Sequence, residues 1–136
     1  MALELVVVTP EGEALSETVE QVVLPGEAGE FGVLESHERF LTPLSPGPMQ
    51  IVRGGANREW AAISSGFAEV DGAHVVVLVD RCRRASEIDH AETEARRVEA
   101  ADALAALPED EEHAGERLRL AGVVATAELD LDVVGR

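Results

Sequence analysis

Three glycines, Gly26, Gly29 and Gly32, form the most regular motif that could do chemistry in this chain. Glycines at such short spacing can let backbone N–H groups cradle a phosphate. This segment, however, has neither the Gly-Lys-Ser/Thr of a P-loop nor the Gly-x-Gly of a dinucleotide fold. Glu27 and Glu30 lie between the glycines and would repel a phosphate. We therefore interpret the glycines as turn and close-approach residues of a loop.

The remaining polar residues do not form a catalytic or metal-binding pattern. The four histidines, at positions 37, 74, 90 and 113, are widely separated and lack the spacing of zinc ligands. No serine has the Gly-x-Ser-x-Gly setting of a nucleophile elbow. Cys82 is the only cysteine, so an internal disulfide cannot form, which fits a reducing compartment. The sequence thus predicts a protein that is not an enzyme and holds no metal or cofactor.

Arg81, Arg83 and Arg84 form the one basic cluster of the sequence. Two interpretations are open. In the first, which we favour because exposed charges usually do no more, these are solvated side chains that offset an acidic neighbourhood. In the second, they form a latch for the acidic C-terminal segment, or an anion site.

Acidic residues dominate the composition, with 27 Asp and Glu against 11 Lys and Arg and a net charge of −16. Such a field repels nucleic-acid phosphates and anionic lipid, so a basic protein surface is the better partner. No apolar run approaches the roughly 20 residues of a membrane span. The start, MALELVVVTPEGE, also lacks the basic n-region of a signal peptide. We therefore expect neither nucleic-acid binding nor direct membrane insertion.

Short valine-rich runs separated by turn residues predict β-strands up to about residue 80. We expect strands at 3–9, 19–23, 49–52, 60–64, 67–70 and 74–79, with Val19, Gln21 and Val23 on one face of the second. Asp71-Gly72 is a strong hairpin signal, because its turn needs residues that tolerate positive φ. Strands that follow one another without intervening helices predict a β-sandwich or flattened barrel.

After Arg84 the apolar residues recur at the spacing of one face of a helix. Ser86 to Asp89 resembles a capping box and predicts a helix that ends near Leu107. A second, weaker helix is expected at 112–127. The predicted apolar stripes are Ile88, Ala91, Ala95, Val98, Ala101 and Ala105 on the first helix, and Leu118, Ala121, Ala125 and Leu129 on the second. The predicted architecture is β plus α, with a β-sandwich domain at 1–85 and an antiparallel α-helical hairpin at 86–136.

Several motifs, in matching order and spacing, resemble the epsilon subunit of bacterial F-type ATP synthases, which is called delta in mitochondria. These motifs are LPGEAGEFGVL at 24–34, His37, LTPLSPG at 41–47, SSGFAEV at 64–70 and Glu87-Ile88-Asp89. The resemblance covers nearly the whole chain. Any one of these motifs would be a weak signal, whereas all of them in register are a strong one.

The resemblance implies a non-catalytic central-stalk subunit that couples proton or sodium flow to ATP synthesis. Its sandwich would bind the gamma subunit and rest on the polar loops of the membrane c-ring. Implied c-ring contacts are Glu27, Glu30, Phe31 and Gly32, and implied gamma-facing residues are His37 and Thr42. The implied location is the cytoplasmic face of the bacterial inner membrane, as a peripheral part of the complex.

The helical hairpin departs from the family pattern. Members that sense ATP carry Ile-Asp-x-x-Arg-Ala, but here Glu92 stands in the place of the arginine and disfavours a triphosphate. The hairpin is a candidate contact for the catalytic alpha and beta subunits. Its last helix offers only Arg117 and Arg119 among several acids, so we expect weak or absent inhibition of ATP hydrolysis.

A stand-alone β-sandwich module that binds carbohydrate or a peptide is the alternative function. Such a module needs an exposed aromatic platform or a polar cleft. With Trp60 and three phenylalanines, the chain offers little for stacking on a sugar.

Overall fold

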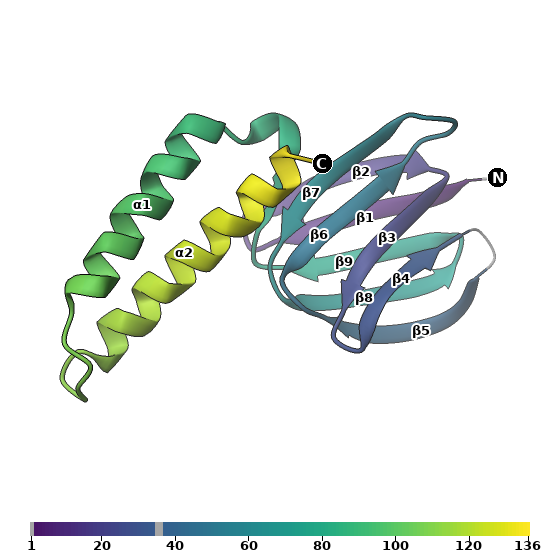
Figure 1. Cartoon of the computed structure of the whole chain (residues 1–136). Coiled ribbons are helices and arrows are strands. Elements are labelled where there is room, and N and C mark those ends of the chain that lie inside the picture. The colour runs from purple at the N-terminus through teal and green to yellow at the C-terminus, as the bar shows by residue number, and fades with distance from the viewer. Residues whose placement is uncertain (1, 35–36) are drawn as a thin grey trace. The chain divides into compact units, whose positions relative to one another are not determined.

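The computed structural model describes residues 2–34 and 37–136, and for positions 37 and 38 it gives the backbone alone. The chain divides into two compact units, Met1–Ala85 and Ser86–Arg136. The strands of the first unit (Figure 1) are β1 (Leu3–Thr9), β2 (Gly12–Val19), β3 (Gln21–Gly26), β4 (Gly29–Val33), β5 (His37–Leu44), β6 (Gly47–Val52), β7 (Arg58–Ile63), β8 (Gly66–Gly72), β9 (His74–Val79) and β10 (Cys82–Arg84). A short 3-10 helix, η1 (Ala85–Glu87), precedes the helices α1 (His90–Ala106) and α2 (Ala114–Val134).

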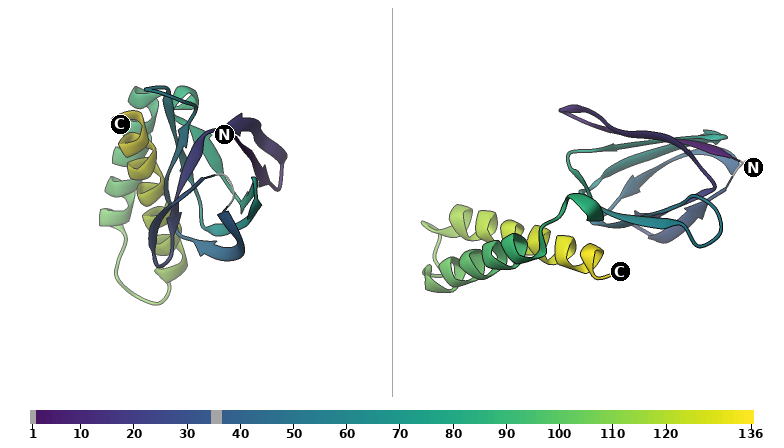
Figure 2. Two further views of the ribbon diagram at one scale, coloured as in Figure 1. Left: turned by 90° about the vertical axis from the view of Figure 1, so that its right-hand side faces the viewer. Right: turned by 90° about the horizontal axis from the view of Figure 1, so that it is seen from above.

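The strands of the first unit form the two facing layers of a sandwich (Figures 1 and 2). One layer contains β10, β7, β6 and β3, with β4 paired to β3, and the other contains β5, β8, β9, β1 and β2. Within the described residues, β1 and β9 are parallel and the other paired strands are antiparallel. Among the residues that the structure describes, Gly26 and Leu44 are the register pair that joins β3 to β5. The predicted fold class, a β-sandwich or flattened barrel followed by two helices, is confirmed.

An aliphatic core fills the space between the layers, because alternate residues of each strand point inward. In β1, Leu3, Leu5 and Val7 are fully buried while Glu4 is exposed. Other fully buried large side chains include Val22, Leu24, Val33, Leu44, Met49, Ile51, Ile63, Val70, Val75 and Val77. The low aromatic content is therefore compensated by branched aliphatic residues, as the composition requires.

Two glycines are needed for the β8–β9 pair. Gly72 has a φ of +61° and forms, with Ala73, the turn between the paired residues Asp71 and His74, so the predicted hairpin is present with its turn one position later than Asp71-Gly72. At Gly66 the constraint is space, because a Cβ there would lie 1.9 Å from the carbonyl oxygen of Leu78. A side chain at position 66 would therefore force β8 and β9 apart.

The segment at 24–47, interpreted from its glycines as a loop, in fact contains the end of β3 together with β4 and β5. The shared face predicted for Val19, Gln21 and Val23 is wrong, because the chain changes strand at Glu20. The N–H of Glu20 donates a hydrogen bond of 2.8 Å to the carbonyl oxygen of Val52. This shift turns Val22 into the core, where it is fully buried, and leaves Val23 half-buried.

The helical unit begins later than expected. Asp89, and not Ser86, caps α1, since its carboxylate accepts a hydrogen bond of 3.0 Å from the N–H of Glu92. α2 extends to Val134, seven residues beyond the predicted end at 127. Neither described helix combines the length and hydropathy that a bilayer crossing requires.

The predicted apolar stripes of the helices are also wrong. The buried residues are Thr93 and Ala100 on α1, and Leu120, Ala127, Asp130 and Val133 on α2. Val98 and Leu118, which the predicted stripes contained, are 42% and 76% exposed. Alanine recurs so often in this segment that several faces of each helix carry apolar residues at helical spacing. Which face is buried is decided by the packing of side chains and not by this spacing. The chosen interface includes a buried carboxylate, Asp130, whose partner Arg96 lies 3.4 Å away.

Candidate functional site

The β3–β4 hairpin ends in an exposed acidic tip. Glu27 and Ala28 form the turn between the paired residues Gly26 and Gly29, and all side chains from Glu27 to Glu30 are exposed. The N–H of Glu27 donates a hydrogen bond of 3.1 Å to the carbonyl oxygen of Pro43 in β5. The tip is thus held by backbone contacts, and its two carboxylates are available to a partner.

Phe31 and Gly32, the other two residues predicted for the c-ring contact, support this tip from within. The Phe31 ring meets Phe40 edge to face, with 5.8 Å between centroids, and packs against the core. Gly32 lies against Gln21, whose Nε2 would be 2.7 Å from a Cβ at position 32. The structure therefore gathers all four residues in one hairpin, with the glutamates outward and Phe31 partly buried. Their contact with a c-ring stays a prediction.

The two residues predicted to face gamma lie in β5. The side chain of His37 falls outside the described residues. Thr42 is half-buried and lies between Phe40 and Leu44, whose side chains belong to the core side of the strand. Because side chains alternate along β5, Leu41 and Pro43, which flank Thr42, point to the outside of the sandwich. Leu41 is 65% exposed.

The outside of the β5–β8–β9–β1 layer carries an apolar patch beside the exposed polar residues Glu4, Glu69, Asp71 and His74. We call it the outer apolar face and define it by Val6, Val8, Leu41, Pro43, Phe67, Val76 and Leu78. Four of these residues form one row in direct register: Pro43 pairs with Phe67, Phe67 with Leu78, and Leu78 with Val8. Phe67 and Leu78 are 51% and 44% exposed. An antiparallel sheet with apolar residues on both faces usually has its outer face covered by a partner.

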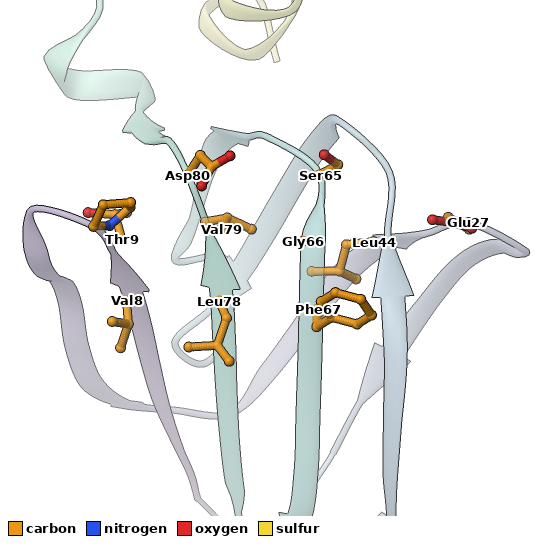
Figure 3. Close-up of a pocket in the computed structure, with 11 residues that line it drawn as sticks. Val8, Thr9, Glu27, Leu44, Ser65, Gly66, Phe67, Leu78, Val79 and Asp80 are labelled. Carbon is orange, nitrogen blue, oxygen red and sulfur yellow. The ribbon is translucent and has the colours of Figure 1, made fainter.

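Three residues of this row line a groove of about 550 Å³ (Figure 3). Phe67, Leu78 and Val8 project from neighbouring strands along it, and Glu27 of the hairpin tip lies at its rim. Asp80 and the hydroxyl-bearing Ser65 and Thr9 complete the polar part of the rim (Figure 3). The acidic tip and the outer apolar face are therefore parts of one continuous surface.

This surface has the chemistry of a protein-binding site. Apolar side chains in its centre favour an apolar partner, and the carboxylates of Glu27, Asp80 and Glu69 favour lysine or arginine around that contact. Within the described residues, no group of three or more His, Cys, Asp or Glu side chains is placed to hold a metal ion.

The predicted arginine cluster is divided by the structure. Arg84 donates two hydrogen bonds of 2.7 Å to the carboxylate of Glu59 in β7, whereas Arg83 is exposed on the other face of β10. Arg81 contributes its backbone, with its N–H 3.0 Å from Ser64 Oγ. A latch or anion site made of all three arginines stays a prediction, although the pairing of Arg84 with Glu59 argues against it.

Arg84 belongs to a network of four charges, which we call the edge network: Glu17, Arg53, Glu59 and Arg84. Arg53 donates two hydrogen bonds to Glu17, at 2.6 and 2.5 Å, and one of 2.5 Å to Glu59. The network thus connects β2 with β10, which are the two end strands of the sheet order. Side chains therefore connect the two end strands, for which no register pair is present among the described residues.

The hydrogen bonds of the edge network lower the pKa values of its two carboxyl groups. Those from Arg84 and Arg53 hold the pKa of the Glu59 carboxyl below its ordinary value, although burial acts in the opposite direction. The hydrogen bond from Arg53 likewise lowers the pKa of Glu17. Both carboxylates are therefore stabilised in their ionised form.

Sequence reasoning missed the outer apolar face and the edge network. One signal for the face was present: His74–Val79, HVVVLV, is apolar at consecutive positions instead of alternating, which is typical of a strand covered on both sides. The edge network had no such signal, because its members are far apart in sequence.

Comparison with known proteins gives consistent matches. The family model described as ATP synthase, Delta/Epsilon chain, beta-sandwich domain matches residues 2–85. The ATP synthase epsilon chain of Anaeromyxobacter dehalogenans (strain 2CP-1) is 40% identical over 137 residues, covering 100% of both chains. That of Anaeromyxobacter sp. (strain Fw109-5) is 42% identical over 113 residues, covering 83% of this chain and 85% of the relative.

Solved structures share the fold. A chain of the mitochondrial ATP synthase of Euglena gracilis, in a structure of OSCP, F1 and c-ring, superimposes with a TM-score of 0.68 at 24% identity, covering 98% of this chain and 78% of that one. A chain from the central stalk and c-ring of the Tetrahymena thermophila mitochondrial enzyme gives a TM-score of 0.60 at 14% identity, covering 98% and 97%.

Proposed function

Since this chain belongs to the ATP synthase delta/epsilon chain family, we propose that it is a central-stalk subunit of an F-type ATP synthase. In this role it links the gamma subunit to the c-ring, so that proton or sodium flow through the membrane sector drives ATP synthesis in the catalytic sector. The chain itself is non-catalytic. It is a peripheral component, and its place is the cytoplasmic face of the bacterial inner membrane.

The observation that carries this proposal is the continuity of the outer apolar face with the acidic hairpin tip. A rotor connector needs two adjacent surfaces of different chemistry. One must hold permanently to the stalk, for which apolar burial is suited. The other must meet polar loops, for which exposed carboxylates at a glycine-bounded turn are suited.

We assign the gamma subunit to the outer apolar face together with β5. Phe67 and Leu78 lie at the centre of its exposed row and are the expected anchors, because they offer large exposed apolar side chains whose burial favours binding. The c-ring polar loops are assigned to Glu27 and Glu30 at the tip.

The helical unit is expected to act weakly on the catalytic alpha and beta subunits. The two arginines of α2 that could approach an acidic surface are already engaged within the unit. Arg117 donates to the carbonyl oxygens of Leu104 and Leu107, at 3.2 and 2.8 Å, and Arg119 pairs with Glu116. Glu92 in α1 disfavours ATP binding there.

Co-elution of this chain with its cognate gamma subunit in size-exclusion chromatography tests the proposal. Phe67→Asp places a charge in the centre of the outer apolar face and should abolish co-elution. Leu118→Asp is the matched control, because Leu118 is also a large exposed apolar residue but lies on α2. Glu30→Arg should still co-elute with gamma and should lose binding to isolated c-ring in detergent.

Circular dichroism of each variant shows whether it is folded. A folded wild-type chain that does not bind gamma would remove the central-stalk role, and a stand-alone binding module would become the better hypothesis. If Phe67→Asp binds gamma as well as the wild type does, the central-stalk role survives but gamma docks elsewhere.

A further inference from the structure

A second groove lies at the loop end of the helical hairpin, where the segment 107–113 joins α1 to α2 (Figure 1). We call it the tip groove, and its volume is about 800 Å³. The residues that line it lie between positions 104 and 121, within the helical unit. Its chemistry can therefore be described from this unit alone.

The apolar part of the lining comes from both helices. It consists of Leu104 of α1 and of Ala114, Leu118 and Ala121 of α2. The last three residues follow one another at intervals of four and three, so they share one face of α2. This face is not the buried one, since Leu120 is buried whereas Leu118 is 76% exposed, the highest fraction among the large apolar side chains that the structure describes. The apolar spacing at Leu118 and Ala121 therefore lies on an exposed face, as in a helix that meets a partner there.

The acidic part of the lining comes from the loop. Glu109, Asp110 and Glu111 belong to a run of four acids at 109–112. The side chains of Glu109 and Asp110 are 86% and 48% exposed. Arg117, the basic residue of the lining, is already engaged, because it donates to two carbonyl oxygens at the C-terminal end of α1 and lies 3.6 Å from Glu109. The tip groove therefore presents negative charge to a partner.

Hydrogen bonds hold the loop in the shape that forms the tip groove. The carboxylate of Asp110 accepts a hydrogen bond of 2.9 Å from the N–H of His113 and lies 2.7 Å from the Nδ1 of the same residue. The hydrogen bonds of Arg117, at 3.2 and 2.8 Å, join the start of α2 to the end of α1. Because the loop is already ordered in this way, binding here would require little further ordering of the chain.

We propose that the tip groove docks a basic amphipathic segment of a partner protein, with an apolar side chain against Leu118 and lysine or arginine beside Glu109 and Glu111. Charge complementarity selects this occupant, because the run of four acids repels an acidic segment or a phosphate. None of the described residues that line the groove is aromatic, so a sugar has no ring on which to stack. This inference goes beyond the proposed function and does not depend on it, since the lining shares no residue with the surfaces assigned to gamma and the c-ring.

A synthetic helical peptide with leucines on one face and lysines on the other is the probe. It is titrated into the isotope-labelled full-length chain, and the amide chemical shifts are followed by NMR. We expect saturable binding, with the largest shift changes at Leu104, at Leu118 and in the loop 109–111. A peptide with serine in place of leucine and one with glutamate in place of lysine should each bind about tenfold more weakly or less.

Substitution of Leu118 tests the apolar contact. Leu118→Ser should weaken binding of the leucine–lysine peptide about tenfold, because burial of a leucine side chain contributes about that factor. Leu41→Ser is the matched control, since Leu41 is a leucine of the sandwich that is 65% exposed. This control should leave the affinity for the peptide unchanged.

Substitution of two carboxylates tests the acidic contact. Replacing Glu109 and Glu111 together by glutamine should weaken binding of the peptide and reduce its dependence on salt. Replacing Glu11 and Glu13 together by glutamine is the matched control, because these two exposed glutamates have the same spacing and their loss changes the net charge equally. The control should change neither the affinity nor its salt dependence.

The proposal is overturned if no saturable binding occurs, or if the shift changes spread over the acidic surface or centre on the outer apolar face. It is also overturned if Leu118→Ser has no effect, or if the two glutamate pairs have equal effects, since the peptide would then respond to the net charge alone. Failure of the proposal would leave the central-stalk role intact, because co-elution with gamma tests that role separately.

Discussion

Replacing Glu59 by glutamine tests whether the edge network stabilises the β-sandwich through its charges. Glu59 is the centre of the network, since it accepts one hydrogen bond from Arg53 at 2.5 Å and two from Arg84 at 2.7 Å. Its side chain is 15% exposed. Glutamine keeps the shape of the side chain and removes its charge, so the variant leaves two arginines facing one remaining carboxylate, that of Glu17.

The expected loss follows from the exposure of the partners. A hydrogen bond to a charged group contributes about 1.5–3 kcal/mol when it is shielded, and an exposed ion pair contributes less than about 1 kcal/mol. The side chains of Arg53 and Arg84 are 21% and 33% exposed, so their interaction with Glu59 is intermediate between a shielded hydrogen bond and an exposed ion pair. We expect Glu59→Gln to lower the free energy of unfolding of the sandwich by about 2 kcal/mol at pH 7. For a domain of this size that lowers Tm by about 8–16 °C.

The pH dependence identifies charge as the cause. The folded-state pKa of Glu59 lies below its ordinary value of 4.5, so the wild type gains stability from the ionised form. This contribution is complete above pH 4.5 and is lost as the pH falls through the folded-state pKa. Urea denaturation, followed by the fluorescence of Trp60, should therefore show a difference between wild type and Glu59→Gln that shrinks as the pH is lowered from 7 to 3.

Glu69→Gln is the control, because Glu69 is an exposed carboxylate on β8 outside the network. It should change the unfolding free energy by less than about 0.5 kcal/mol. The reasoning is refuted if the effect of Glu59→Gln is the same at pH 3 as at pH 7, since the side chain would then act through packing and not through charge.

Other substitutions test the fold and the helical unit. Gly66→Ala should prevent a stable sandwich, because its Cβ would lie 1.9 Å from the carbonyl oxygen of Leu78, and far-UV circular dichroism would show the loss. Gly115→Ala and Gly122→Ala should each stabilise α2 by about 1 kcal/mol, since neither added Cβ meets a neighbouring atom, and thermal melting at 222 nm measures the gain. A chain that ends at Ala85 should leave the ATP hydrolysis rate of the assembled complex nearly unchanged, and a large rise in that rate would show that the helices inhibit.

The sequence predicted the class of fold and the strands β1, β6, β7, β8 and β9 because those depend on local patterns, whereas it missed most of β2, one of the two longest strands. The runs at 3–9 and 74–79 combine valine with flanking turns, and Asp71-Gly72 fixes a hairpin within four residues. β4 and β5 were missed because their glycines and proline suggest a loop, whereas pairing with β3 and β8 makes them strands. Tertiary pairing overrides local propensity at such positions.

The candidate site was predicted in part, for a similar reason. The exposed tip at Glu27 and Glu30 follows from a local glycine pattern, so the sequence indicated it. The row from Pro43 through Phe67 and Leu78 to Val8 depends on the order of four strands. That order is set by contacts between distant segments and cannot be read from any one of them.

The parallel pairing of β1 with β9 has a consequence for how the chain folds during synthesis. Leu5 pairs with Val75, so β1 cannot find its second neighbour until the ribosome has released almost the whole sandwich sequence. Contacts that close such long loops form slowly. The helical hairpin, whose contacts are local, can form quickly even though it is translated last. Completion of the β1–β9 pair is therefore the step expected to limit how fast new subunits become ready for assembly.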